Sequence, residues 1–331
     1  MNKILFFVDI YKWLFNLNRF LAGGKVTIFF FILQCKTQCW TQLQAIYTLF
    51  MKIFKESESL NVYLNTQRII ANKVGFVPTM GALHEGHLSL IRRSTQTADI
   101  TVCSIFVNPL QFNNTEDFRK YPKTLENDIM LLEQSGCDVL FMPGEKEIYP
   151  DEASRIPHYE LGYAATVLEG KFRPGHFEGV CLVVEKLLNI VNPDFLFLGQ
   201  KDFQQCIIIE RLIQLMNKNT QLIICPIVRE ESGLAMSSRN LRLSSSERKT
   251  AAAIYQHLVW IKEKLTTDNF KDLQKKAISE LEEMGFKTDY LELANRNTLE
   301  LIDVCKKGEE AIILIAVFLN GVRLIDNQLI N

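Results

Sequence analysis

Residues 74–87 read VGFVPTMGALHEGH, and they indicate the fold class more clearly than any other stretch. The first five residues form an apolar run that predicts a buried β-strand. A loop with Gly81 and Gly86 follows, and Leu88 and Ile91 then begin a helical pattern. A glycine-containing loop between a strand and a helix places backbone N–H groups where anions, and phosphates above all, bind. The stretch therefore predicts an α/β unit with an anion site at its first strand–helix turn.

Strands and helices continue to alternate beyond this stretch. Apolar runs at 100–107, 139–142, 195–198 and 222–228 predict further strands, as a parallel sheet covered on both faces requires. We predict a helix that Thr124 caps and Gly136 ends, and further helices over 180–191 and 202–216. This alternation is typical of a doubly wound, Rossmann-like parallel-sheet domain, which we assign to residues 51–227.

The pattern changes after about residue 228. Ser244 and Glu247 have the spacing of a capping box, and helices are predicted from there to about residue 284. Apolar runs return over 289–294 and on both sides of Asn320-Gly321, a dipeptide typical of a β-hairpin. Residues 228–331 are therefore predicted to form a smaller α+β lid domain.

Charge and cysteine usage limit the function classes. The net charge of −1 gives no reason to expect electrostatic binding of nucleic acid or of a membrane surface. None of the eight cysteines belongs to a C-x-x-C pair, and several lie in apolar runs. This usage is typical of a reducing compartment, so we expect a cytoplasmic protein without structural zinc or a disulfide framework.

Residues 1–50 do not match the rest of the chain. They are apolar and aromatic, Asp9 and Lys12 interrupt any signal-peptide pattern, and the longest uncharged apolar run is about half a bilayer crossing. We expect the native protein to start at Met51 and residues 1–50 to be an atypical extension read from upstream. A membrane-surface extension is the alternative.

Two histidines stand at the predicted anion site. His84 and His87 are three residues apart at a helix start, so their side chains face the same way and can donate hydrogen bonds to phosphate oxygens. A zinc protease needs H-E-x-x-H, whereas this chain has H-E-G-H, so a metal is disfavoured. An isolated H-x-x-H is more often incidental, but its place after the first strand favours a function.

Four more segments are candidates for the same crevice. Gln111, in FVNPLQF, could bind a hydroxyl or carboxylate, or simply satisfy turn backbone. In FRPGHFEGV, Arg173 could contact a carboxylate or shape the site, and His176 could be a structural loop residue. Lys201, in GQKDFQQ, follows a strand and suits a phosphate contact. Finally, GLAMSSRN, residues 233–240, is either a mobile phosphate clamp or a solvated linker.

Other nucleotide and hydrolase signatures are missing from the sequence. It contains no G-x-x-x-x-G-K-[ST], no G-x-G-x-x-G after the first strand and no G-x-S-x-G. P-loop, nicotinamide-dependent and α/β-hydrolase chemistry are therefore disfavoured.

In this order, PTMGALHEGH, FVNPLQF, FRPGHFEGV, GQKDFQQ and GLAMSSRN resemble the pantoate–β-alanine ligase (pantothenate synthetase) family. H-x-G-H alone would indicate only the wider nucleotidyltransferase superfamily. The resemblance covers essentially everything from Met51 to the C-terminus. It implies an enzyme, usually a homodimer, that uses Mg-ATP to convert pantoate into pantoyl adenylate and pyrophosphate. The amine of β-alanine then attacks the adenylate and gives pantothenate and AMP.

The resemblance also implies roles for individual residues. Gln111 would hold pantoate and β-alanine, Gln205 would hold pantoate, His87 would be the family's proton donor, and Asp128 would lie near Mg²⁺. Catalytic contacts are expected from His84, His87, Lys201, Ser237, Ser238 and Arg239. Residues expected at ATP are Met80, Gly81, Ala82, Leu83, His84, Glu85, Gly86, His87, Gly199, Gln200, Lys201, Asp202, Val228, Met236, Ser237, Ser238 and Arg239. At position 200, the resemblance leads us to expect glutamate at least as often as glutamine. The glutamine found there leaves the ligand-facing groups in place.

Three alternatives remain open at this point. Another nucleotidyltransferase would share the histidine pair but would have no reason to present Gln111 and Gln205 together. A non-catalytic nucleotide-binding protein would be expected to have lost part of the phosphate-facing set, which is intact in this sequence. A membrane-associated protein is the reading that residues 1–50 would favour.

Overall fold

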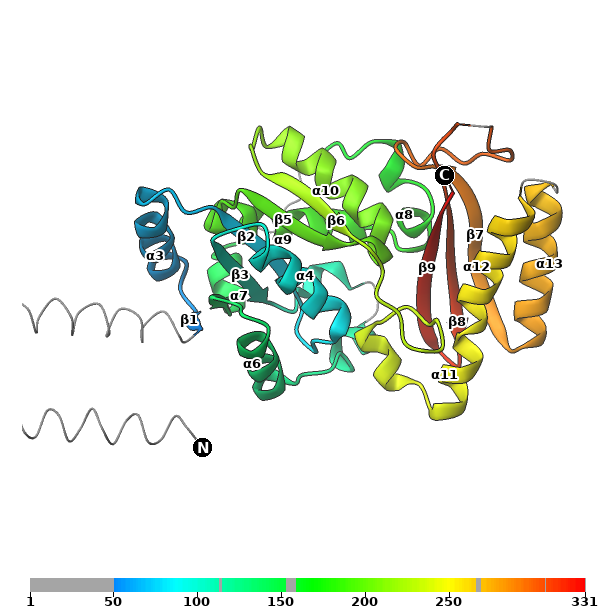
Figure 1. The fold of residues 1–331 in the computed structure, drawn as a ribbon, viewed down its shortest axis with the longest axis horizontal. Helices are drawn as coiled ribbons and strands as arrows, with labels where there is room; N and C mark the ends of the chain where they lie inside the picture. The colour runs from blue at the N-terminus through cyan, green and yellow to red at the C-terminus, as the bar shows by residue number, and fades with distance from the viewer. Residues whose placement is uncertain (1–50, 113–114, 153–158, 266–268, 307, 331) are drawn as a thin grey trace, which may run out of the picture. The chain divides into compact units, whose positions relative to one another are not determined.

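The computed structural model describes residues 51–112, 115–152, 159–265, 269–306 and 308–330. Figure 1 shows two sheets in this part of the chain, each accompanied by helices. The expectations about residues 1–50 lie outside the described residues. Among the described helices, none is long and apolar enough to cross a bilayer.

The larger sheet is parallel, with the strand order β1-β4-β3-β2-β5-β6. Its strands are β1 (Lys52–Phe54), β2 (Val74–Thr79), β3 (Ile100–Ile105), β4 (Val139–Phe141), β5 (Phe195–Gly199) and β6 (Gln221–Cys225). The order reverses between β2 and β5, so the crevice outside the carboxyl ends of these two strands is where a ligand is expected. The sequence did not predict β1, because a three-residue edge strand is too short to show a pattern.

Helices cover both faces of this sheet. On one face, apolar side chains of α3 (Ser57–Ile69), α9 (His176–Val191) and α10 (Phe203–Leu215) pack on β2–β5. On the other face, α4 (Glu85–Thr95) and α6 (Leu125–Gln134) do the same. The shorter helices are α5 (Thr115–Arg119), α7 (Glu145–Ile148) and α8 (Glu169–Phe172). The predicted doubly wound fold is confirmed.

Two local predictions in this domain were wrong in detail. Helix α9 begins at His176 rather than near residue 180, because Gly175 adopts a left-handed conformation (φ 81°) that starts the helix early. Thr124 occupies the position before α6, but its side chain does not accept a backbone N–H. Its hydroxyl instead donates to Asp128 Oδ1 at 3.0 Å, so the threonine orients a carboxylate rather than capping the helix.

The second sheet is antiparallel, in the order β7 (Phe286–Asn295), β8 (Ala311–Leu319) and β9 (Val322–Ile330). Both Asn320 (φ 47°) and Gly321 (φ 76°) are left-handed, as the tight β8–β9 turn requires. The helices that precede this sheet in the chain are α11 (Ser245–Ala251), α12 (Ala253–Lys264) and α13 (Phe270–Glu283). The predicted Ser244–Glu247 capping box is present at the start of α11. The α+β character of this region is confirmed, whereas the boundary at 227/228 remains a prediction.

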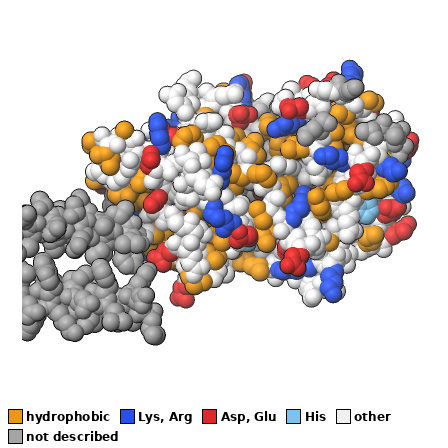
Figure 2. Space-filling view, in the orientation of Figure 1, with side chains coloured by type: hydrophobic (Ala, Val, Ile, Leu, Met, Phe, Trp, Pro, Cys, Tyr) orange, Lys and Arg blue, Asp and Glu red, His pale blue; other side chains and the backbone are white. Residues whose placement is uncertain are grey.

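The antiparallel sheet is buried on both faces. Its outer face packs on α12 and α13. On its inner face, Tyr290 and Leu314 pack against Leu168 and Phe203 of the larger domain. Strand β9 therefore faces the larger domain (Figure 1), where it contacts the turn that enters α10. Acidic and basic side chains are interspersed over the face shown in Figure 2.

Candidate active site

A buried carboxylate fixes the loop between β2 and α4. Gly81 (φ 77°) and Ala82 (φ 49°) turn the chain sharply after the strand. The backbone N–H groups of Ala82 and Leu83 donate to the two oxygens of Asp128, at 2.9 and 2.8 Å. Asp128 is only 1% exposed, and these bonds satisfy its charge in the interior. The shape of the loop therefore depends on a side chain of α6.

The two imidazoles lie side by side at the start of α4. Their ring centroids are 4.1 Å apart. Nδ1 of His84 accepts from the Gly86 N–H at 3.2 Å, and Nδ1 of His87 accepts from the His84 N–H at 3.4 Å. Because Nδ1 is an acceptor in both rings, a neutral ring carries its proton on Nε2. Gly86 is required here, since a Cβ at this position would lie 2.9 Å from the His84 ring.

Burial keeps both rings neutral. It lowers the pKa of His84 to about 4, and the nearby Lys201 ammonium adds to this effect. Burial likewise lowers the pKa of His87 well below its ordinary value, with His84 and Lys201 contributing. At neutral pH the pair therefore presents two Nε2–H hydrogen-bond donors rather than two cations.

Both rings line a cavity of about 220 Å³ at the point where the strand order reverses. Most of the predicted site meets there, although the segments come from five separate parts of the sequence. The predicted residues that line it are Met80, His84, Gly86, His87, Gln111, Gly199, Lys201, Asp202, Gln205, Val228, Met236, Ser237, Ser238 and Arg239.

The remaining predicted residues do not line the cavity. Ala82 and Leu83 are buried within the loop. Glu85 forms an ion pair with Arg92, and Gln200 bonds to Asn327. A Cβ at Gly81 would lie 3.1 Å from side-chain atoms of Ile105 and Asp128, so the loop packs closely at this position.

Contacts with the loop around α8 and α9 hold Gln111 in place. Its carbonyl accepts from His176 Nδ1 at 2.9 Å and from Arg173 at 3.4 Å. Its side-chain amide lies 3.0 Å from the sulfur of Met80. Gly179 allows α9 to pack closely, because a Cβ there would meet the Leu110 carbonyl oxygen at 2.3 Å. His176 and Arg173 thus both position Gln111 through its backbone carbonyl. A contact of Arg173 with a ligand carboxylate stays a prediction.

The 237–239 segment closes the cavity from the other side. Ser238 donates to the Ala82 carbonyl at 3.0 Å, which ties this segment to the histidine loop. Ser237 accepts the Arg239 N–H at 3.2 Å. The Arg239 guanidinium forms an ion pair with Asp117 at 2.9 Å, and Asp117 also binds Arg242 at 2.7 Å. Sequence reasoning missed Asp117 and Arg242, because neither stands in a recognisable motif.

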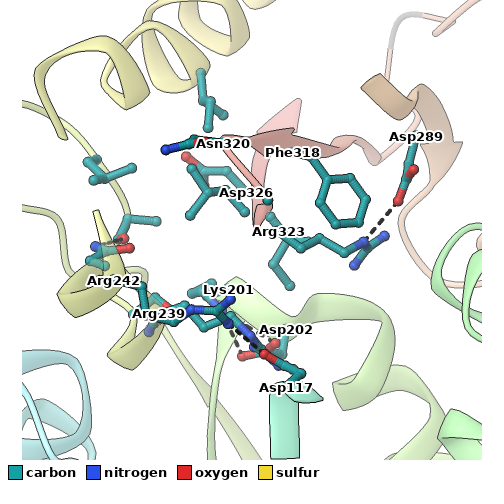
Figure 3. Close-up of a pocket in the computed structure, with 18 of the residues that line it drawn as sticks. Asp117, Lys201, Asp202, Arg239, Arg242, Asp289, Phe318, Asn320, Arg323 and Asp326 are labelled. Carbon is teal, nitrogen blue, oxygen red and sulfur yellow. Dashed lines mark hydrogen bonds and ion pairs between the residues drawn. The ribbon is translucent and has the colours of Figure 1, made fainter. Parts of the chain in front are cut away.

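A second cavity of about 510 Å³ adjoins the first and shares Lys201, Asp202, Ser237 and Arg239 with it. Figure 3 shows Lys201, Arg239 and Asp117 on one side of this space and Arg323 with its partner Asp289 on the other. Six cationic side chains line it, together with five acidic ones and several apolar ones. The cations could bind a polyphosphate chain that extends from the histidine loop.

The described residues do not form a protein metal site. They contain no cluster of three or more His, Cys, Asp or Glu side chains with suitable placement. Both oxygens of Asp128 accept hydrogen bonds from the loop, so the carboxylate has the role of a loop anchor. That Asp128 lies near Mg²⁺ stays a prediction.

Comparisons with known proteins agree with this arrangement. The sequence profile of the family described as pantoate-beta-alanine ligase matches residues 52–329. A pantothenate synthetase from Cytophaga hutchinsonii is 44% identical over 278 residues, which is 82% of this chain and 97% of that protein.

Solved structures give the same picture. Pantothenate synthetase from Thermus thermophilus superposes with a TM-score of 0.76 at 36% identity, covering 84% of this chain and 99% of that one. Pantoate-beta-alanine ligase from Francisella tularensis, complexed with beta-gamma ATP and β-alanine, gives 0.68 at 40% identity, covering 84% and 97%. The chain therefore belongs to the pantoate–β-alanine ligase family.

Proposed function

We propose that this chain joins pantoate to β-alanine at the expense of ATP, through a pantoyl-adenylate intermediate. The observation that carries the proposal is that Gln111 and Gln205 line the same cavity as His84, His87 and Lys201. A nucleotidyltransferase acting on another acceptor would need the phosphate-facing groups but not the two amides. Family membership supports the same reaction, as does the Francisella relative, whose structure is a complex with beta-gamma ATP and β-alanine.

In the first step, the site holds two anions together. The Nε2–H groups of His84 and His87, with Lys201 and Arg239, bind the phosphates, while the amides of Gln111 and Gln205 bind pantoate. The pantoate carboxylate attacks the α-phosphorus, the bond to the bridging oxygen breaks, and pyrophosphate leaves. The fixed donors stabilise the charge that develops on the phosphate, and positioning supplies the rest of the acceleration. His87 acts here as a hydrogen-bond donor.

In the second step, the neutral amine of β-alanine attacks the acyl carbon of the adenylate. The amide bond forms, the bond between the acyl carbon and oxygen breaks, and AMP leaves with that oxygen. One amine proton passes to solvent. Gln111 serves this step too, by holding β-alanine beside the acyl group. No covalent enzyme intermediate is needed, because the adenylate is already activated.

We also propose that ATP enters as its Mg²⁺ complex. Mg²⁺ keeps several water ligands and is commonly held through substrate phosphates. Phosphate oxygens and water would therefore provide its ligands, and no protein carboxylate is assigned to it.

A cytoplasmic location is supported by the buried free thiols of Cys103, Cys137, Cys181 and Cys206, which are typical of a reducing compartment. A homodimer follows from the family resemblance, and sedimentation equilibrium of the full chain would test it.

An isotope experiment tests the adenylate directly. Pantoate labelled with ¹⁸O at both carboxylate oxygens is incubated with ATP, β-alanine and the full chain. Attack on the α-phosphorus transfers one labelled oxygen to AMP and leaves the other in the amide of pantothenate. Unlabelled AMP, or ADP with labelled phosphate, would contradict the proposed chemistry.

In Gln111→Leu, the KM values for pantoate and β-alanine should rise together while that for ATP stays within about twofold.

A further inference from the structure

One buried side chain of the last strand forms hydrogen bonds to the turn that carries Lys201. Asn327 of β9 is 1% exposed. Its Nδ2 donates to the carbonyls of Gln200 and Lys201, at 2.8 and 3.1 Å. Its Oδ1 accepts from Nε2 of Gln200 at 3.0 Å. A single amide from the C-terminal sheet thus uses all three bonds to fix residues 200 and 201.

The preceding residue holds a second ATP-binding segment. Asp326 points to the opposite face of β9, as alternation along a strand requires. It accepts two bonds from the Arg229 guanidinium, at 2.6 and 2.9 Å. That guanidinium also lies over the Tyr255 ring, with its carbon 3.7 Å from the ring centroid. Arg229 directly follows Val228, which lines the cavity and whose carbonyl accepts the Met236 N–H at 3.0 Å.

Asp326 and Asn327 are themselves connected. The backbone N–H of Asn327 donates to Asp326 Oδ1 at 2.8 Å, which ties the Asp326 side chain to the backbone at Asn327. Both side chains are almost completely buried. A buried polar group that loses its hydrogen-bond partner destabilises the folded protein. Among the described side chains, the ion pair of Lys201 is with its neighbour Asp202, and it is a weak one, at 3.4 Å. The direction of Lys201 into the cavity therefore depends on the backbone that Asn327 holds.

We propose that Asp326 and Asn327 are positioning residues of the ATP site. Asn327 fixes the backbone at Lys201 and so positions the Lys201 side chain to contact the phosphates. Asp326 binds Arg229 and so fixes the position of the neighbouring Val228. The inference rests on the proposed function and extends the ATP site onto the last strand of the fold. Asn327 acts through Lys201, and Asp326 acts through Arg229 on Val228; Lys201 and Val228 both line the cavity.

The test compares substitutions on β9 in the full chain. In Asn327→Ala, the KM for ATP should rise about tenfold while the KM for pantoate stays within about twofold. Asn327→Ser keeps one donor and should fall between Ala and the wild type. Gln328→Ala is the matched control, because Gln328 lies on the same strand and its side chain bonds to the Leu329 carbonyl, away from the ATP segments. Its KM for ATP should not change.

A double-substitution experiment separates positioning from simple loss of packing. The dissociation constant for ATP is measured by equilibrium binding for Asn327→Ala in the wild-type and in the Lys201→Ala backgrounds. If Asn327 acts through Lys201, the tenfold loss should shrink to less than about twofold in the second background. The same loss in both backgrounds, or unchanged ATP binding in Asn327→Ala, would overturn the inference.

Failure of the positioning role can be distinguished from failure of the proposed function. A wild-type protein that binds ATP but makes no pantothenate contradicts the function, while the ATP dissociation constants still test the positioning role. A wild-type protein that binds no ATP contradicts both. If Asn327→Ala does not fold, Asp326→Asn is used. It should weaken ATP binding while thermal unfolding stays cooperative, and unchanged binding there would overturn the inference as well.

Discussion

The Glu169 carboxylate joins the two sheets, and its removal has a predictable effect on stability. Glu169 of α8 is 6% exposed. It accepts two bonds from Arg323 of β9, at 2.7 and 2.8 Å, and one from the Tyr290 hydroxyl at 2.8 Å. Arg173 Nη1 also donates to Glu169 Oε2, at 3.3 Å. In Glu169→Gln, the same shape remains but the charge that these partners surround is lost.

The expected magnitude follows from the ionisation of Glu169. Burial alone would raise the pKa of this carboxyl, but the hydrogen bonds and charge of Arg323, with Arg173 and Tyr290, lower it from 4.5 to about 2. At about 1.4 kcal/mol per pKa unit, this favours the folded state by about 3 kcal/mol at neutral pH. Breaking a buried ion pair by removing one partner costs about 3–5 kcal/mol, which agrees. We therefore expect Glu169→Gln to lose about 3 kcal/mol of unfolding free energy.

Urea unfolding of the full chain at several pH values provides the assay. A lowered pKa gives stabilisation that is complete above 4.5 and disappears as the pH falls toward 2. The difference between wild type and Glu169→Gln should therefore be largest at about pH 6–7 and shrink progressively below about pH 4.5. Glu310→Gln is the control, since its pair with Arg296 is exposed and should change stability by less than about 0.5 kcal/mol. A loss under about 1 kcal/mol, or a loss independent of pH, would refute the reasoning.

Three further predictions concern the cavity. Asp117→Asn frees Arg239 and Arg242, so hydrogen exchange over residues 237–242 should become faster in the free protein; unchanged exchange would argue against a closing role for Asp117. Asp128→Asn cannot accept both loop N–H groups, so kcat/KM for ATP should fall about tenfold, and an unaffected value would show that the loop holds without it. In NMR titrations, His84 should titrate near pH 4 and be neutral from about pH 5 upward, because burial and Lys201 oppose its charge; a midpoint near 6.5 would contradict this.

The sequence was most informative where one segment carries its own signal. The apolar run of 74–78, the glycine loop and the i, i+3 spacing of His84 and His87 are local features, and they predicted β2, α4 and the facing imidazoles. Three of the other four segments were expected in the same crevice because each follows a strand of one parallel sheet. FRPGHFEGV was placed only at the start of a helix. That rule needs only the order of elements, which periodicity supplies.

The parts that the sequence could not predict depend on partners far along the chain. The hydrogen bonds of Asp128 were not predicted, since they join its oxygens to N–H groups 45 and 46 residues away. Asn327 and Glu169 find their partners 126–127 and 154 residues away. In a strand such as VRLIDNQLI, a polar residue at an inward position gives no indication of what it meets. Only the packing of the second sheet on the first determines that.

Pyrophosphate release from ATP tests the central claim most directly. It is measured on the full chain with pantoate, with and without β-alanine, and again for His87→Ala. We predict release that depends on pantoate, falls by about two to three orders of magnitude in His87→Ala, and yields pantothenate only when β-alanine is present. A folded protein without pantoate-dependent release would contradict the ligase assignment and indicate a nucleotidyltransferase with another acceptor.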